Sequence, residues 1–238
     1  MTSLPLAPLP RDAERRAERH VMFDIESLGC DAGDVFFAIA AVPFDPYEGT
    51  LGQPFFALVD PADAVRHGLR SDPGTIQWWE KQSSEARAYL DAASTEGAPL
   101  DHALKRLSAY LHEVVGPRDQ IRVWGKGADF DKPFLDAGYR VCHLPQPWGP
   151  RAARCYRTLE AFMPVAPPRM TLTGIAHHAL DDTIHQAMQA IPALREIYRM
   201  EPLVAPILPP PSSRWVEDPL AREVVVEAPE RRRRRQPR

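Results

Sequence analysis

The sequence of 238 residues predicts an α/β domain, in which a mixed sheet carries helices on its faces. Three apolar segments of strand length, at about 20–26, 35–42 and 55–59, follow one another through short loops. A helical stripe of apolar residues then covers 100–115, and a fourth strand-like segment at 121–124 leads into another helix. We therefore expect an antiparallel meander of the first three strands, combined with parallel strands formed later in the chain.

The remaining elements follow from local signals in chain order. The third strand stops at Asp60-Pro61. Ser71 or Asp72 caps a helix that begins at Pro73, and residues 83–90 form a second short helix with its own cap.

After the fourth strand, three helices are predicted. The first opens at Lys132 and ends near Gly138. The second covers 152–162, and the third continues from Asp181-Asp182 to about residue 199.

The two ends of the chain differ from its centre in composition. Residues 1–19 form a lead-in rich in Pro, Arg and Glu, and 20–200 form the predicted domain. From 201 to 238 the chain is rich in proline and carries five consecutive arginines at 231–235, which predicts a disordered or loosely docked tail. The arginine run can bind phosphate or act only as a solubilising terminus, and the sequence leaves both readings open.

Composition excludes several classes of protein. Hydrophobic residues make up 44% and charged residues 26%, as in a soluble globular protein, and no apolar run is long enough to span a bilayer. The odd count of three cysteines, without CxxC spacing, indicates a reducing cytoplasm and no zinc knuckle. The net charge of −3 disfavours electrostatic coating of nucleic acid, but it is compatible with an acidic pocket neutralised by bound metal ions.

Two carboxylates lie at the end of the first predicted strand. Asp24 and Glu26 are two residues apart, so their side chains project from the same face of the strand. Half-buried carboxylates repel one another and are costly to desolvate unless a cation lies between them. Their hard oxygen ligands suit Mg²⁺ or Mn²⁺, although a solvated strand end before Gly29 would show the same pattern.

Further acids occur at later element ends. Asp131 follows the fourth strand, and the run His177-His178-Ala179-Leu180-Asp181-Asp182 precedes the last long helix. Side chains at such positions can converge on one cleft of an open sheet. Together they can hold two cations about 3.5–4 Å apart, the arrangement used for in-line phosphodiester hydrolysis, with a histidine accepting the proton of the attacking water.

Four sequence segments resemble the motifs of a known family. F-D-I-E-S-L-G at 23–29, W-G-K-G-A-D-F-D-K-P-F-L at 124–135 and H-H-A-L-D-D at 177–182 are similar to the three motifs of the DEDDh 3′–5′ exonucleases. D-P-G-T-I-Q-W-W at 72–79 resembles a segment of the phage- and bacterial-type exoribonuclease branch. The resemblance covers roughly residues 20–200 and implies a ribonuclease H-like fold.

The resemblance also implies roles for individual residues. Asp24, Glu26, Asp131 and Asp182 would bind two Mg²⁺ or Mn²⁺ ions, and His177 would be the general base. His178 and Asp181 would be neighbours of the site. The substrate-binding residues implied or proposed alongside them are Ser27, Leu28, Trp78, Trp79, Lys126 and Phe130. Of the two tryptophans, we expect one to pack in the core and the other to face the cleft.

The implied activity is stepwise 3′–5′ hydrolysis of single-stranded nucleic acid that has a free 3′ end, releasing nucleoside 5′-monophosphates, with RNA favoured over DNA. Lys126 and Asp129 depart from the family pattern, which has Asn and a small polar residue there. They keep open an alternative, a catalytically weak nucleic-acid-binding or scaffold protein of the same fold. The sequence leaves the choice between a monomer and a homodimer open as well.

Overall fold

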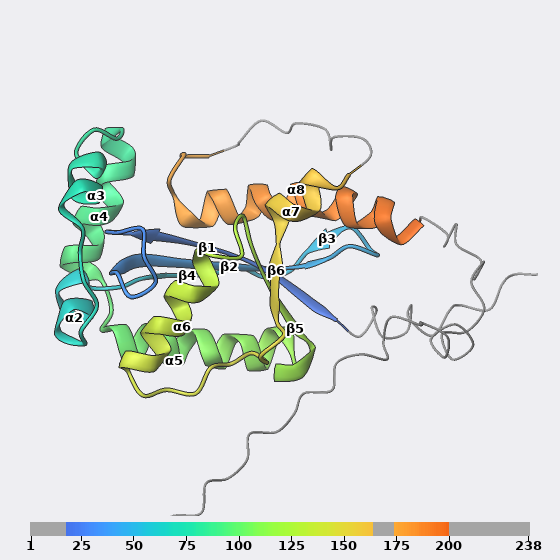
Figure 1. Ribbon diagram of the computed structural model, residues 1–238, viewed down its shortest axis with the longest axis horizontal. Coiled ribbons are helices and arrows are strands. Elements are labelled where there is room, and N and C mark those ends of the chain that lie inside the picture. The colour runs from blue at the N-terminus through green and yellow to red at the C-terminus, as the bar shows by residue number, and fades with distance from the viewer. Residues whose placement is uncertain (1–17, 164–173, 200–238) are drawn as a thin grey trace, which may run out of the picture. The chain divides into compact units, whose positions relative to one another are not determined.

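A six-stranded mixed sheet forms the centre of the structure, a computed structural model that describes residues 18–163 and 174–199 (Figure 1). The strand order is β3-β2-β1-β5-β6, and β4 pairs with β2 beside β3. The strands are β1 (Arg19–Ser27), β2 (Phe36–Asp45), β3 (Thr50–Leu51), β4 (Phe55–Leu58), β5 (Ile121–Gly125) and β6 (Ala153–Cys155).

The directions of the strands confirm the predicted mixed sheet. β1 and β2 are antiparallel, as are β2 and β4, whereas β5 lies parallel to β1 and β6 parallel to β5. In the β1–β2 pair, Asp24 lies opposite Ala40 and Glu26 opposite Ala38. Directly opposite residues share a face of the sheet. Because these partners are alanines, space for other side chains remains beside the two carboxylates.

Helices cover both faces of the sheet and one of its ends. They are α2 (Pro61–Arg66), α3 (Pro73–Trp79), α4 (Ser84–Glu96), α5 (Leu100–Tyr110, extended by a π-helical turn over Leu111–Val115), α6 (Asp131–Val141), α7 (Tyr156–Ala161) and α8 (Ala179–Arg199). Figure 1 shows α8 on the face opposite α5 and α6. None of the helices in the described part of the chain is long and apolar enough to cross a membrane.

Each face of the sheet has its own apolar core. The larger core joins β1 and β2 to α5 and α6 through residues such as Phe23, Leu104 and Phe134. The smaller one packs α8 against the other face, where Ala187 and Ile191 meet side chains of β1, β2 and β5. The positions of β1 and β2 are therefore fixed from both faces of the sheet.

Several predicted elements differ from the observed ones; the helix predicted over 83–90, for example, continues to Glu96. The helix predicted over 152–162 begins only at Tyr156, because the preceding residues 153–155 pair in parallel with β5 as strand β6. Asp60-Pro61 does not only end a strand: it also starts α2, since the Asp60 carboxylate accepts a hydrogen bond from the Ala62 N–H at 2.8 Å.

Helix α6 continues three residues beyond Gly138, which was predicted to lie near its end. A Cβ atom at this position would lie 2.7 Å from the Phe36 ring, so glycine is needed here for close packing and not for termination. Of the two candidates Ser71 and Asp72 for the first cap, Asp72 is the one that caps α3, and the predicted cap of the second helix is Ser83; each side chain accepts a backbone N–H of its helix. The predicted tail at 201–238 and most of the lead at 1–19 lie outside the described residues.

Candidate active site

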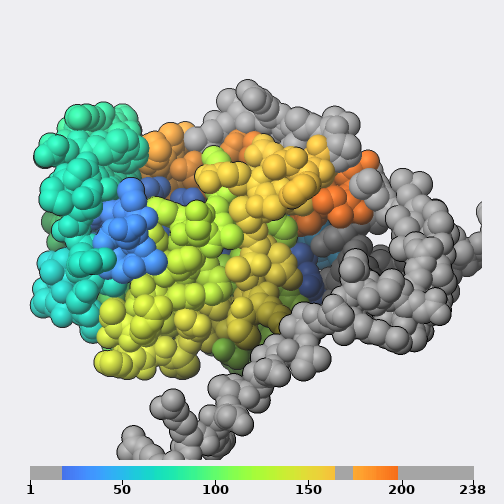
Figure 2. Space-filling model, in the orientation of Figure 1, coloured from blue at the N-terminus to red at the C-terminus, as the bar shows by residue number. Residues whose placement is uncertain are grey.

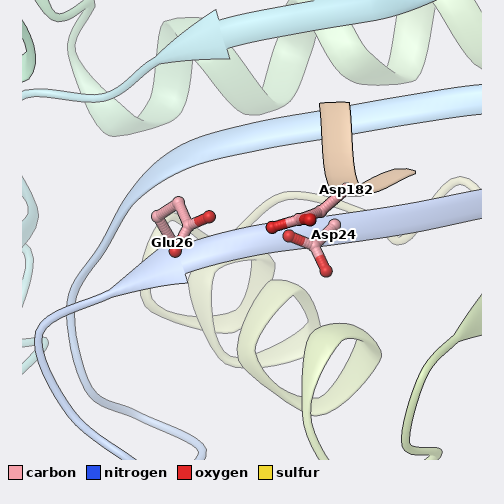
Figure 3. Close-up of side chains that lie close together, drawn as sticks. All are labelled: Asp24, Glu26 and Asp182. Atoms are coloured by element: carbon pink, nitrogen blue, oxygen red, sulfur yellow. The ribbon is translucent and has the colours of Figure 1, made fainter. Parts of the chain in front are cut away.

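Carboxylates from β1 and α8 meet at one point of the structure. Asp24 and Glu26 of β1 and Asp182 of α8 each offer an oxygen, and these oxygens lie within 4.8 Å of one another (Figure 3). Asp131, the first residue of α6, is buried and lies outside this group of three. Its negative charge nevertheless raises the pKa of both Asp24 and Glu26.

Burial and mutual repulsion disfavour the ionised forms of these acids. Burial, followed by the charges of Asp131 and Glu26, raises the pKa of Asp24 well above its usual range. Burial and the charges of Asp182 and Asp131 raise the pKa of Glu26 to about 8. Burial raises the pKa of Asp131 to about 7, against the opposing effect of backbone N–H groups. A divalent cation would relieve this repulsion, and the all-oxygen donor set fits Mg²⁺ or Mn²⁺.

Three of the four carboxylates accept a hydrogen bond from a neighbouring N–H group. The Ile25 N–H donates to Asp131, and the His177 N–H donates to Asp182 Oδ2 at 3.0 Å. The side chain of Gln186 donates to Asp24 Oδ1 at 2.9 Å.

Gln186 was not among the predicted site residues. The sequence signal for it is its spacing from Asp182, which precedes it by four residues, because residues four apart lie on the same face of a helix.

His177 lies at the edge of this centre in an unusual backbone conformation. Its φ of 63° falls in the left-handed region, which is uncommon for residues other than glycine. The imidazole ring meets the Trp78 ring edge-on, with centroids 5.0 Å apart, and is 6.3 Å from the Trp79 ring. The predicted general base is thus held against the tryptophan pair.

His178 and Asp181, predicted as neighbours of the site, fix the loop that carries His177. The His178 ring packs on Tyr89 of α4 with centroids 4.0 Å apart, and its Nδ1 atom lies 3.3 Å from Asp181 Oδ2. Asp181 Oδ2 also accepts the Ile175 N–H at 2.9 Å. The two consecutive histidines therefore have different surroundings and different structural partners.

A cavity of about 370 Å³ opens beside Glu26. Its wall includes both tryptophans, Ser27 and Phe130. Trp79 is only 2% exposed and belongs to the core, whereas Trp78 is 42% exposed, which is the division expected from the sequence. Figure 2 shows the loop after β1, which contributes to this wall, at the surface between the α2–α4 group and α6.

The remaining predicted substrate residues divide into two groups. Ser27 donates its hydroxyl to the Gly29 carbonyl, and Phe130 packs on Phe134, with ring centroids 4.6 Å apart. Both line the cavity. Leu28 is buried in the larger core, and Lys126 is exposed in the loop after β5. The structure thus brings four of the six residues together around one cavity.

Comparison with known proteins assigns the chain to a family. Residues 19–192 match the model of the 3′–5′ exoribonuclease Rv2179c-like domain. The chain belongs to this family of nucleases. As an Rv2179c-like domain it is also similar to the exodeoxyribonuclease of Enterobacteria phage T4, with 26% identity over 121 residues. That match covers 48% of this chain and 52% of the phage protein, so the chain spans about half the length of this curated relative.

Solved structures show the same fold. The nuclease domain of 3′hExo, a DEDDh family member, is matched over 75% of this chain and 92% of its own, with a TM-score of 0.51 and 15% identity. Exonuclease I of E. coli, in complex with a dA16 oligonucleotide, is matched over 76% of this chain and 42% of its own, with a TM-score of 0.54 and 16% identity. The Rv2179c-like domain therefore has the ribonuclease H-like α/β fold of the DEDDh exonucleases, as predicted.

Proposed function

We propose that this protein is a metal-dependent 3′–5′ exonuclease that shortens single-stranded RNA and releases nucleoside 5′-monophosphates. The observation that carries the proposal is the meeting of Asp24, Glu26 and Asp182 within 4.8 Å, with the charge of Asp131 acting on the same centre. Membership in a 3′–5′ exoribonuclease family supports it.

The four acids Asp24, Glu26, Asp131 and Asp182 would hold two Mg²⁺ or Mn²⁺ ions. Such ions make hydroxide available at neutral pH and stabilise the leaving 3′ oxygen. The donor chemistry fits them, because buried carboxylates whose pKa values are raised by one another's charges gain most from a divalent cation.

His177 would act as the general base of the reaction. Its backbone N–H donates to Asp182, and its ring packs edge-on against Trp78, so the loop that carries the imidazole is fixed beside the acidic centre. From there the imidazole would accept a proton from the attacking water. The cavity beside Glu26 offers the exposed face of Trp78 and the ring of Phe130 to the 3′-terminal nucleoside. Stacking of a base on an aromatic ring contributes about 1–3 kcal/mol.

Single-stranded RNA is the favoured substrate, and single-stranded DNA is the second candidate. The family description names exoribonucleases, and the 3′hExo nuclease domain was solved with rAMP bound. The phage relative is an exodeoxyribonuclease, and E. coli exonuclease I binds a DNA oligonucleotide. These neighbours support a single strand with a free 3′ end as the common substrate class.

The proposal is tested with matched RNA and DNA oligonucleotides labelled at the 3′ or the 5′ end. With Mn²⁺ or Mg²⁺, the 5′-labelled RNA is expected to shorten stepwise, the 3′ label to appear at once as mononucleotide, and EDTA to stop both. Asp24→Asn and Asp182→Asn should abolish shortening, whereas Asp91→Asn on the exposed side of α4 should not affect it.

Three results would contradict the proposal. One is wild-type activity in Asp24→Asn or in EDTA, since the carboxylates and metal would then be dispensable. The second is binding of the oligonucleotides without any shortening, which would favour the scaffold alternative. The third is cleavage of a circular substrate, which would instead identify an endonuclease.

A further inference from the structure

Gln186 contacts the acidic centre directly, although none of the four sequence motifs includes it. It lies on α8 one turn after Asp182 and is only 5% exposed. Its Nε2 atom donates a hydrogen bond of 2.9 Å to Asp24 Oδ1, a contact between residues 162 positions apart in the chain.

The chemistry of the pair fixes the orientation of the amide. In the ionised form that binds a metal, a carboxylate only accepts hydrogen bonds, so the glutamine must then present its NH₂ group to Asp24 and turn its oxygen away. In this orientation Gln186 Oε1 is buried and has no hydrogen-bond partner among the described residues. A buried acceptor without a partner costs about 1–3 kcal/mol, so a glutamine is an unfavourable choice here unless its donor is needed.

The donor is needed because the carboxylate group of an aspartate rotates easily. Rotation about the Cβ–Cγ bond of aspartate is soft, and an Asp side chain must be held by a neighbour if its oxygens are to keep one direction. Backbone N–H groups do this for Asp131 and Asp182. For Asp24 the donor is a side chain, the only one that donates to these carboxylates within the described part of the chain.

We propose that Gln186 is a positioning residue: its amide holds the Asp24 carboxylate in the orientation that binds the catalytic metal. The inference rests on the proposed function, because it assigns Asp24 to a metal site. The alternative is that Gln186 only fills space between buried neighbours such as Ala187 and Ala190. In that case any side chain of equal volume would serve as well.

The variant Gln186→Met separates the two roles, because it keeps the length and volume of the side chain and removes the donor. Gln186→Asn keeps the amide and shortens its reach by one methylene group. Gln189→Met is the matched control: Gln189 lies on the same helix, is partly buried and makes no hydrogen bond among those found in the described residues. Metal-free melting temperatures and circular dichroism report whether each variant is folded.

Mn²⁺ binding is then measured by calorimetry, and kcat and KM by hydrolysis of a short RNA. Both Gln186 variants should bind Mn²⁺ about 10–100-fold more weakly and show a lower kcat with an unchanged KM for RNA, while Gln189→Met behaves like the wild type. Wild-type Mn²⁺ affinity in folded Gln186→Met or Gln186→Asn would overturn the inference and leave the proposed function intact. A wild-type protein that binds no Mn²⁺ and cuts no RNA would overturn both.

Discussion

Two neighbouring histidines at this site have different contacts. His177 lies against Trp78, and its N–H is bonded to Asp182, whereas His178 packs on Tyr89 and lies 3.3 Å from Asp181. The left-handed φ of His177 separates the two rings. The backbone of the loop thus places His177 beside the tryptophan pair and His178 beside α4.

Replacement of His177 tests its role as general base. Asn is the suitable substitute because it tolerates a left-handed φ better than Ala does and carries no basic group. His177→Asn is expected to lower kcat about 10²–10⁴-fold, with Mn²⁺ binding retained. His185→Ala, on the next turn of α8, is the control, and steady-state kinetics on a short RNA provide the measurement. Equal activity of the two variants would exclude His177 as the base.

At the scale of single residues, the sequence predicts the acidic residues of the site but not the groups that hydrogen-bond to them. Residue type and position indicate Asp24, Glu26, Asp131 and the Asp181-Asp182 pair, since carboxylates at several element ends indicate a metal site. The resemblance to the exonuclease motifs is what selects Asp182 from that pair. For Gln186, the spacing of four residues indicates only that it shares a helix face with Asp182. Its role could not be predicted, because a glutamine has no comparable preference for metal and its contact with Asp24 depends on how α8 packs across β1. Only the tertiary structure shows that contact.

At the scale of elements, α3 is anchored to the end of β1 through Trp79. The Trp79 indole N–H donates to the Ser27 carbonyl at 2.8 Å, and its ring meets Phe37 edge-on with centroids 5.1 Å apart. This contact joins the helix that carries the cavity wall to the strand that carries Asp24 and Glu26. The cavity and the acidic centre are therefore linked through one buried side chain.

Trp79→Phe is expected to destabilise the fold through the lost hydrogen bond. The Ser27 carbonyl would remain buried without its donor, at a cost of about 1–3 kcal/mol in the free energy of unfolding. Trp78→Phe, at a position 42% exposed, should change that free energy by less than about 0.5 kcal/mol. Urea unfolding followed by circular dichroism measures the free energy of unfolding of both variants. Equal decreases in the two variants would show that the hydrogen bond of the Trp79 indole N–H does not stabilise the fold.

Elements were predictable where local signals agreed with packing. The caps at Asp72 and Ser83 determine helix starts that the structure confirms. Residues 153–155 were misassigned to a helix because their three-residue strand is stabilised by pairing with β5, a partner about 30 positions earlier. The end of α6 was placed too early because glycine is a helix terminator in most contexts, whereas Gly138 makes room for Phe36.

At the scale of the whole molecule, the acidic centre links stability to pH. In the metal-free protein the pKa of Glu26 is about 8 and that of Asp131 about 7, above the ordinary values of 4.5 and 3.8. Between the ordinary and raised values the folded state retains protons that the unfolded state has lost. The free energy of unfolding therefore falls as pH rises through this window.

Buried His20 acts in the opposite direction, but only at lower pH. Burial lowers its pKa from 6.5 to about 4, so its neutral form favours folding increasingly up to pH 6.5. Above this value the contribution of His20 is constant, and the raised pKa values of Glu26 and Asp131 still lower the free energy of unfolding as pH rises.

The melting temperature of the metal-free protein should thus fall between pH 6.5 and 8. Glu26→Gln should flatten this dependence, and Mn²⁺ should raise the melting temperature more at the upper end. Scanning fluorimetry in EDTA and in Mn²⁺ provides the test. Parallel curves for the wild type and Glu26→Gln would show that Glu26 does not carry the linkage.

The position of α8 in the chain has a consequence for protein synthesis. A ribosome makes Asp24 and Glu26 early, but Asp182, His177 and Gln186 emerge only with the last described helix, and the contact that joins Gln186 to Asp24 spans 162 positions. A nascent chain that stops before α8 lacks one of the three clustered carboxylates and the helix that covers one face of its sheet. Under the proposed function, a nuclease built in this order acquires its activity only after α8 has been made and has packed against β1.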